Sequence, residues 1–315
     1  MIDVELNLIK YGIIGNGNHS KRIQNILKKK KLNFLIYKPS KPNYFDKEKF
    51  LKLKSCDAVF IVSPDKTHFS YIKKLYKHCY IFCEKMPVTK INDLKKLKKI
   101  DNKKIYFNFN DRFSHFGIIL KNLKKYKLKN LIYANIISSH GLALKNEYKK
   151  SWRSNFKKCP KGVYQLVSIH YIDLINYFFK IDKIETPNLI NFSKIGTSFD
   201  TSSSKIMLKN KAIIELFTTY NSSFYKKFSF VFENGIIDFS HNKLTIRGPS
   251  KTFNKNGLFI TPKIKYQTNI NDQKDFLLSL EKSVDFFVKQ VKKKMNFKMR
   301  EFRKSLETNL LLLEK

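Results

Sequence analysis

The chain has few cysteines, few arginines and no long apolar run, and each shortage excludes a class of protein. Its four cysteines, among 315 residues, form no CxxC pair and no cysteine–histidine spacing typical of a metal site. We therefore expect small buried thiols and no metal. No stretch approaches the roughly 18 consecutive apolar residues of a membrane span, so no membrane partner is expected. The N-terminus lacks a basic start and a cleavage site, which is typical of a cytoplasmic protein.

Arginine is scarce although basic residues are abundant. The chain carries 63 Lys and Arg against 25 Asp and Glu, a formal charge of +38, but only six of the basic residues are arginine. The planar guanidinium of arginine is the usual reader of phosphates and bases. The lysines accompany abundant Asn, Ile, Tyr and Phe, a bias typical of AT-rich coding sequence. We expect non-specific attraction to polyanions but no specific nucleic-acid partner.

Short apolar strands alternate with amphipathic helices in the first third of the chain. The strands are expected at 8–14, 34–37, 58–62, 80–83 and 105–109. This alternation predicts an α/β domain with a doubly wound parallel sheet. 

After about Asn110 the pattern changes to consecutive strands. These are expected at 130–138, 204–208, 212–219, 228–232, 236–240 and 243–247, with helices at 113–126, 163–179, 273–292 and 298–313. A run of strands framed by helices predicts a C-terminal α+β domain with a mostly antiparallel sheet. The expected domains are residues 1–110 and 111–315, with packing of the last helix on the first domain as an alternative.

The first strand leads into a glycine-rich loop. Gly15, Gly17 and Ser20 occupy the small-residue positions of G-x-G-x-x-G, with serine in place of the third glycine. Such a loop gives a tight turn, close backbone approach to a pyrophosphate and a helix N-terminus near the negative charge. We therefore expect a Rossmann-type dinucleotide site at Gly15, Gly17, Asn18 and His19. A plain strand–helix turn is the alternative reading of Gly-x-Gly alone.

The second strand lacks the terminal carboxylate that reads the ribose 2′-hydroxyl of NAD. It ends instead in Tyr37-Lys38-Pro39-Ser40-Lys41. Lys38, Ser40 and Lys41 could hold a 2′-phosphate, which favours NADP over NAD as the cofactor. The alternative is that the two lysines are ordinary members of a lysine-rich chain.

An acid and a lysine follow the buried strand at 80–83. Ligands of open α/β sheets bind outside the carboxyl ends of the strands. Glu84 and Lys85 therefore lie where we expect the chemistry.

Together these features resemble the Gfo/Idh/MocA family of sugar-related oxidoreductases. The matching segments are, in order, GIIGNGNHS from Gly12, VSPDKTH at 62–68, CEK at 83–85, NDR at 110–112, SWR at 151–153 and GVYQLVSIHYIDL at 162–174. The resemblance implies hydride transfer between NAD(P) and a hydroxyl or keto carbon of a sugar or nucleotide-sugar. It also implies a homodimer or homotetramer associating through the outer face of the second sheet. The aromatic strand residues Phe217, Phe228, Phe230 and Phe232 would suit such a face, although some must point into the core.

The resemblance also implies a catalytic pair. Lys85 matches the family's active-site lysine, and His170 matches the histidine of its H-x-x-D signature. His170 lies on an apolar helix face, which by itself is more typical of a core histidine. We expect His170 to be the general acid/base and Lys85 to polarise the reacting oxygen, or the reverse.

Other site residues follow from the same resemblance. Ser63, Pro64, His68 and Glu84 match positions that line the cofactor, and His68 could equally be a structural cap. The expected substrate-binding residues, besides Lys85 and His170, are Arg112, Trp152, Arg153 and Asp173. A structural role is open for the first three, and Asp173 could instead orient the His170 ring or cap a backbone group.

Two residues depart from the family pattern. Met86 stands where a proline usually follows the lysine, and Leu166 stands where an Asp or Asn often completes a Lys-Asp-His triad. These departures support one alternative function, a cofactor-binding homologue without activity. The other alternative is a reductase of a non-sugar substrate, like the dihydrodiol and biliverdin reductases.

Overall fold

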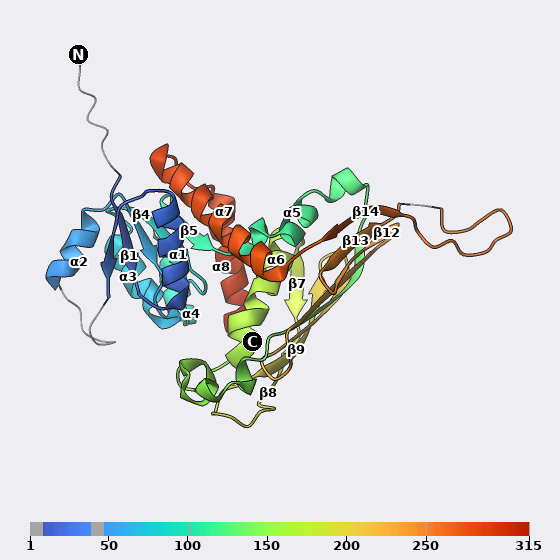
Figure 1. Ribbon diagram of the computed structural model, residues 1–315, viewed down its shortest axis with the longest axis horizontal. Helices are drawn as coiled ribbons and strands as arrows, with labels where there is room; N and C mark the ends of the chain where they lie inside the picture. Colours follow the sequence, from blue (N-terminus) through green and yellow to red (C-terminus); the bar gives the residue numbers. More distant parts are fainter. Residues whose placement is uncertain (1–8, 39–46, 101, 250, 315) are drawn as a thin grey trace, which may run out of the picture. The chain divides into compact units, whose positions relative to one another are not determined.

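The structure is a computed structural model that describes residues 9–38, 47–100, 102–249 and 251–314 (Figure 1). Its residues form two compact units. The first contains the described residues up to Asn110 together with Leu278–Glu314, and the second is Asp111–Leu277. Residues 278–314 thus group with the first unit; the expected boundaries placed them in the second domain, with packing of the last helix on the first domain as the alternative.

The first unit is built on a five-stranded parallel sheet. Its strands are β1 (Tyr11–Ile14), β2 (Phe34–Tyr37), β3 (Ala58–Ile61), β4 (Tyr80–Glu84) and β5 (Ile105–Asn108), in the order β2-β1-β3-β4-β5. β1, β3, β4 and β5 are buried along their whole length, as expected for strands covered on both faces. The predicted doubly wound sheet is confirmed. Its order reverses between β1 and β3, where sheets of this kind bind ligands.

Helices from both ends of the chain cover this sheet. They are α1 (Asn18–Lys29), α2 (Lys47–Lys54), α3 (His68–Leu75), α4 (Ile91–Leu97), the C-terminal part of α7 (Asp272–Lys292) and α8 (Met299–Leu313), with a 3-10 turn at η1 (Asp65–Thr67). Aromatic contacts explain why the C-terminal segment joins this unit. The ring of Phe287 on α7 lies 5.1 Å from that of Phe60, and Phe302 on α8 lies 5.5 Å from Phe107.

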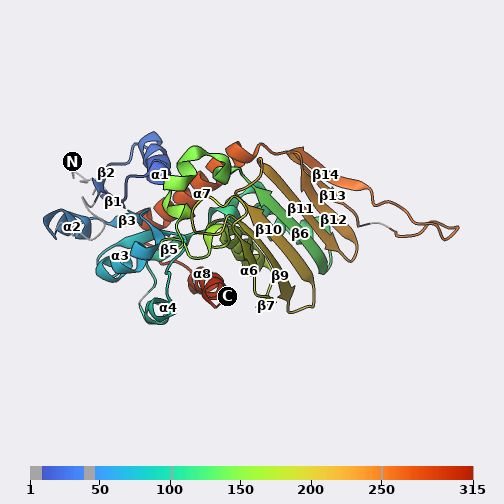
Figure 2. The same cartoon turned by 90° about the horizontal axis from the view of Figure 1, so that it is seen from below.

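The second unit is built on a nine-stranded sheet whose strands lie side by side in Figure 2. Its strands are β6 (Leu131–Ser139), β7 (Ile181–Ile184), β8 (Asn188–Ile190), β9 (Thr201–Leu208), β10 (Ile213–Thr219), β11 (Tyr225–Phe232), β12 (Gly235–Ser240), β13 (Lys243–Arg247) and β14 (Ile264–Asn269). The order is β14-β13-β12-β11-β6-β10-β9-β7, and β8 pairs with β9. Among the described strands of this second sheet only β6 and β10 pair in parallel, which confirms the mostly antiparallel prediction.

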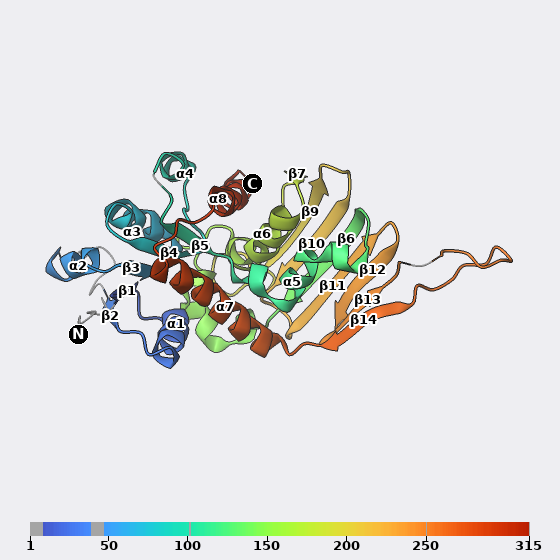
Figure 3. The ribbon, with the colours of Figure 1, turned by 90° about the horizontal axis from the view of Figure 1, so that it is seen from above.

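Two helices, α5 (His115–Lys121) and α6 (Ile169–Phe178), cover one face of this sheet (Figure 3). Phe116 of α5 contacts Phe228, with ring centroids 4.7 Å apart, and Tyr171 of α6 contacts the same ring at 5.6 Å. Phe228, Phe230 and Phe232 are therefore buried core residues. Of the four aromatic residues considered for an oligomer interface, Phe217 alone is exposed, at 38%.

The remaining elements of the second unit are short helical turns. They are η2 (Asn110–Phe113), η3 (Leu123–Tyr126), η4 (Leu142–Leu144), η5 (Asn146–Lys150), η6 (Trp152–Ser154) and a π-helical turn, η7 (Tyr164–Ser168). Two expected helices are therefore interrupted: 113–126 is divided among η2, α5 and η3, and 163–179 begins with the π turn. No helix in the described ranges is long and apolar enough to cross a membrane.

Candidate functional site

The glycine loop lies at the carboxyl end of β1, beside the reversal of strand order. Gly15 has φ +111°, and a Cβ there would lie 2.3 Å from the carbonyl oxygen of Val62. Only glycine fits this turn without strain. At Gly17 a Cβ would meet no atom within 4 Å, so the space above the loop is open. Ser20, in place of the third glycine, is buried and its hydroxyl donates to the Gly15 carbonyl at 2.8 Å.

The N-terminus of α1 follows this loop directly. No side chain caps the helix, and its first turn, which contains Asn18 and His19, has no acidic residue. The first amide groups of a helix lack partners within the helix and carry partial positive charge. This end of α1 is therefore suited to an anion such as a pyrophosphate.

The end of β2 is described only in part. Tyr37 is buried, and its carbonyl accepts a hydrogen bond from the Gly15 amide at 3.0 Å, which joins β2 to the loop. Lys38 is exposed beyond it. Ser40 and Lys41, the other candidates for a 2′-phosphate, lie outside the described residues.

His68 joins the segments that follow β3 and β4. Its imidazole is 1% exposed, with Nδ1 2.7 Å from the carbonyl oxygen of Met86 and Nε2 2.8 Å from that of Ser63. Because both ring nitrogens face backbone carbonyls, His68 has the contacts of a structural residue, which was the alternative to its expected cofactor role. Pro64 is exposed beside it.

Glu84, at the end of β4, is a buried carboxylate with two polar partners. Its Oε1 lies 2.8 Å from Nε2 of His19 and accepts a hydrogen bond from the Asn108 amide at 2.7 Å. Burial alone would raise the pKa of Glu84. The charge and hydrogen bond of His19, the hydrogen bond of Asn108 and the charge of Lys85 outweigh it and lower the pKa to about 2. The carboxylate is thus ionised at neutral pH and links the glycine loop to the strand that carries Lys85.

A chain of hydrogen bonds fixes Asn108, the amide partner of Glu84. The Ser283 hydroxyl, on α7, donates to Oδ1 of Asn108 at 2.6 Å and lies 2.8 Å from the Tyr106 hydroxyl. This chain fixes the Asn108 amide so that its nitrogen faces Glu84. Asn108 and Ser283 were not among the expected site residues. The one sequence signal for Asn108 is that it is a polar residue at the end of an otherwise apolar strand.

His170 lies on the first turn of α6, directly after the π turn. Its side chain is 20% exposed, and Nδ1 lies 3.8 Å from a carboxylate oxygen of Asp111 on η2. A π turn inserts an extra residue into a helix and often occurs at functional sites. It also alters the 3.6-residue periodicity on which the expected apolar face was based.

Arg112 and Asp173, both expected at the substrate, instead bind each other. Nε of Arg112 donates to Asp173 Oδ2 at 2.8 Å and Nη2 donates to Oδ1 at 2.6 Å, with side-chain exposures of 5% and 2%. The guanidinium also lies over the Tyr177 ring, 4.4 Å from its centroid. A buried bidentate pair of this kind holds η2 against α6. This contact gives both residues a structural role, and their role at the substrate stays a prediction.

Trp152 and Arg153 contact each other on η6. The guanidinium lies 4.8 Å from the centroid of the Trp152 ring, with Arg153 exposed and Trp152 partly buried. Arg153 also acts on His140, at the end of β6: burial is the main cause that lowers the pKa of His140, and the charge of Arg153 lowers it further. The exposed Arg153 cation thus contacts the Trp152 ring and influences the His140 ring electrostatically.

The four cysteines are free and buried, as expected for packed thiols. Burial raises the pKa of Cys79 to about 12. A thiol so far from its reactive thiolate form is not a nucleophile.

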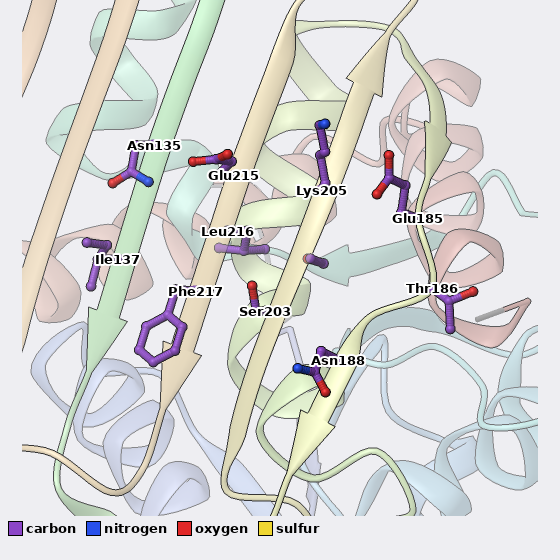
Figure 4. A pocket seen from close by; sticks show the side chains of 11 residues that line it. Asn135, Ile137, Glu185, Thr186, Asn188, Ser203, Lys205, Glu215, Leu216 and Phe217 are labelled. Atoms are coloured by element: carbon purple, nitrogen blue, oxygen red, sulfur yellow. The ribbon is translucent and has the colours of Figure 1, made fainter.

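A separate hollow of about 460 Å³ lies on the face of the second sheet opposite α5 and α6 (Figure 4). Side chains from β6, β9, β10 and the segment before β8 line it, among them Asn135, Glu185, Lys205, Glu215 and Phe217. It contains none of the expected catalytic, cofactor or substrate residues. We therefore do not assign the reaction to it.

Comparison with known proteins identifies a family for part of the first unit. A model of the oxidoreductase family with an NAD-binding Rossmann fold, GFO_IDH_MocA, matches residues 9–106. Those residues belong to the Gfo/Idh/MocA family. The resemblance stated from the sequence is thereby confirmed, and with it an NAD-binding oxidoreductase. No match was found among the curated proteins.

Solved structures share the fold of both units with this chain. A scyllo-inositol dehydrogenase from Lactobacillus casei with bound NAD(H) and scyllo-inositol is 18% identical, with TM-score 0.72 over 97% of this chain and 95% of that one. A myo-inositol dehydrogenase from Corynebacterium glutamicum is 16% identical, with TM-score 0.70 over 96% and 94%. An oxidoreductase from Agrobacterium radiobacter in complex with NAD+, L-tartaric acid and magnesium is 13% identical, with TM-score 0.77 over 97% and 94%. At these identities the likeness concerns the fold.

The loop of this Gfo/Idh/MocA unit fits the cofactor that its family binds. The open space at Gly17 and the uncapped, acid-free start of α1 provide a site for a pyrophosphate. Glu84 and Lys85 follow at the carboxyl end of β4, on the same edge of the parallel sheet as the loop after β1.

Proposed function

We propose that the protein transfers a hydride between NAD(P) and a hydroxyl or keto carbon of a sugar or nucleotide-linked sugar. The observation that carries this proposal is the arrangement at the carboxyl edge of the first sheet. There an ionised Glu84 binds the dinucleotide loop through His19 and directly precedes Lys85. The family match supports the redox chemistry, and the inositol dehydrogenases with the same fold support a polyhydroxylated substrate.

Nicotinamide, when bound, supplies the hydride acceptor or donor. We assign two tasks to this chain's own residues. Lys85 polarises and positions the substrate oxygen through its ammonium group, and His170 takes up or delivers the proton of that oxygen, since an imidazole titrates near neutral pH. Glu84 positions Lys85 and the start of α1 and does not move a proton, because its pKa is about 2.

We also propose NADP as the preferred cofactor and a homo-oligomer as the working form. Lys38 is exposed after β2, where a cation can meet a 2′-phosphate. Phe217 is exposed on the face of the second sheet opposite α5 and α6, beside a hollow with a largely polar lining, and we assign the interface to this face.

The test is a panel of free and nucleotide-linked sugars assayed by nicotinamide absorbance with each cofactor. On the substrate found, Lys85→Ala and His170→Ala should each lower kcat/KM by about 10²–10⁴-fold, the usual range for positioned acid–base groups. Lys90→Ala and His78→Ala, which alter exposed residues of the same types, serve as controls. Near-native turnover by both single variants would exclude this mechanism and favour a homologue without activity.

A further inference from the structure

The site of His170 lacks the carboxylate that its family often supplies from the same helix. Leu166 occupies that position on the π turn and packs against an apolar cluster that includes Tyr148, Val163 and Tyr220. An apolar side chain there cannot orient an imidazole or stabilise its charge.

A carboxylate from another element lies beside the ring. Asp111 is on η2, between β5 and α5, and its Oδ2 is 3.8 Å from His170 Nδ1. Its side chain is 26% exposed, so the carboxylate is partly shielded from water. At 3.8 Å the two atoms do not form a hydrogen bond, but hydrogen bonds of catalytic groups are often long without substrate and shorten in the complex.

Lys226, on neighbouring β11, interacts electrostatically with Asp111. The Lys226 side chain is 24% exposed. Burial by itself would lower its pKa, but the influence of Tyr171, Asp111 and Asp272 outweighs it, so the pKa is raised. Lys226 Nζ lies 3.2 Å from Asp272 at the start of α7, and the Tyr171 hydroxyl donates to Ser138 at 2.9 Å. Asp111 thus interacts electrostatically with Lys226 and lies 3.8 Å from the imidazole.

We propose that Asp111 is the positioning residue of His170 and takes the role that Leu166 cannot fill. Its carboxylate selects the tautomer with a proton on Nδ1, leaves Nε2 for proton exchange with the substrate, and stabilises the imidazolium when it forms. The catalytic group then has a carboxylate partner from η2 and not from its own helix. The role in catalysis depends on the function proposed above, whereas the electrostatic coupling of Asp111 to His170 does not.

The test compares Asp111→Asn, Asp111→Glu and Asp238→Asn. Asp238, on β12, binds the Ser229 hydroxyl away from this cluster and provides the same change of charge in the same unit. The first measurement is an NMR titration of the His170 ring protons. Loss of the carboxylate should move the His170 midpoint to lower pH in Asp111→Asn, whereas Asp111→Glu and Asp238→Asn should leave it near the native value.

The second measurement is the dependence of kcat and KM on pH. Asp111→Asn should lower kcat about 10- to 100-fold with little change in KM, because an imidazole in the wrong orientation or charge state slows proton transfer without weakening substrate binding. Asp111→Glu retains the carboxylate and should recover most of the loss. If Asp111→Asn does not fold, Asp111→Ser removes the same charge with a smaller side chain. An unchanged His170 midpoint in the folded variant would overturn the proposal. If the His170 midpoint shifts in Asp111→Asn but the native protein has no oxidoreductase activity, the coupling of Asp111 to His170 holds and the proposed function is rejected.

Discussion

A substitution in the pair of Arg112 and Asp173 can distinguish a structural role from a catalytic one, because the first affects stability and the second affects turnover. Asp173→Asn keeps the shape and one acceptor oxygen but removes the charge that faces the guanidinium. Both partners are at least 95% buried and share two hydrogen bonds of 2.8 and 2.6 Å. Removing one partner of a buried pair costs about 3–5 kcal/mol, because a buried charge loses its compensation. Since Asn retains one acceptor, we expect a loss of about 3 kcal/mol in the free energy of unfolding.

For a unit of 150–250 residues, about 1 kcal/mol corresponds to about 2–4 °C in Tm, so Asp173→Asn should lower the Tm of the second unit by roughly 6–12 °C. Thermal unfolding followed by circular dichroism measures this change. Asp182→Asn, an exposed position on β7, is the control and should change stability by less than about 0.5 kcal/mol. The argument would be refuted if Asp173→Asn unfolded within about 2 °C of the native protein while kcat/KM fell more than about 100-fold. Asp173 would then be a substrate or catalytic residue, as the sequence first indicated.

Three further predictions concern the first unit. The pKa of Glu84 is lowered from 4.5 to about 2, so its ionised form contributes about 3 kcal/mol to the free energy of unfolding. This contribution should be complete above about pH 5 and be lost as the pH falls toward 2. In Glu84→Gln the stability should therefore depend less on pH in this window, and a pH profile of unfolding equal to that of the native protein would contradict the argument. NADPH should bind more tightly than NADH, and Lys38→Asp should reduce or reverse the preference in fluorescence titrations; equal or tighter NADH binding by the native protein would exclude the role of Lys38. Asn309→Ala should lower the free energy of unfolding by about 2–4 kcal/mol, because the Asn309 side-chain amide forms hydrogen bonds with both the N–H and the carbonyl of buried Val88. Denaturant unfolding measures this loss. An unfolding midpoint equal to that of the native protein would show that other groups replace these hydrogen bonds.

The elements that carry the cofactor could be read from the sequence because their signals are local. The buried strands at 58–62 and 80–83 are continuous apolar runs, and Gly15 marks a turn that only glycine can make. Such patterns report burial and backbone conformation within a few residues. The parallel sheet, the glycine loop and the position of Lys85 after β4 followed from them.

Strands and helices that depend on distant partners were missed or divided differently. β7, β8 and β14 have mixed polar sequences and are strands because they pair with β9 and β13. The C-terminal α7 has an ordinary amphipathic pattern, and only its contacts with Phe60 and Phe82 group it with the first unit. Propensity is a weak guide where tertiary contacts decide the structure.

The sequence by itself determined the fold class and the dinucleotide loop, because glycine positions and apolar periodicity act over short distances along the chain. The tertiary structure alone decided which polar groups are partners. His19 meets Glu84, Arg112 meets Asp173 and Asp111 meets His170 across about 60 residues of intervening chain in each case. No periodicity encodes such pairs. They form because a buried charge must find an opposite charge or a hydrogen bond once the strands and helices have brought it out of water.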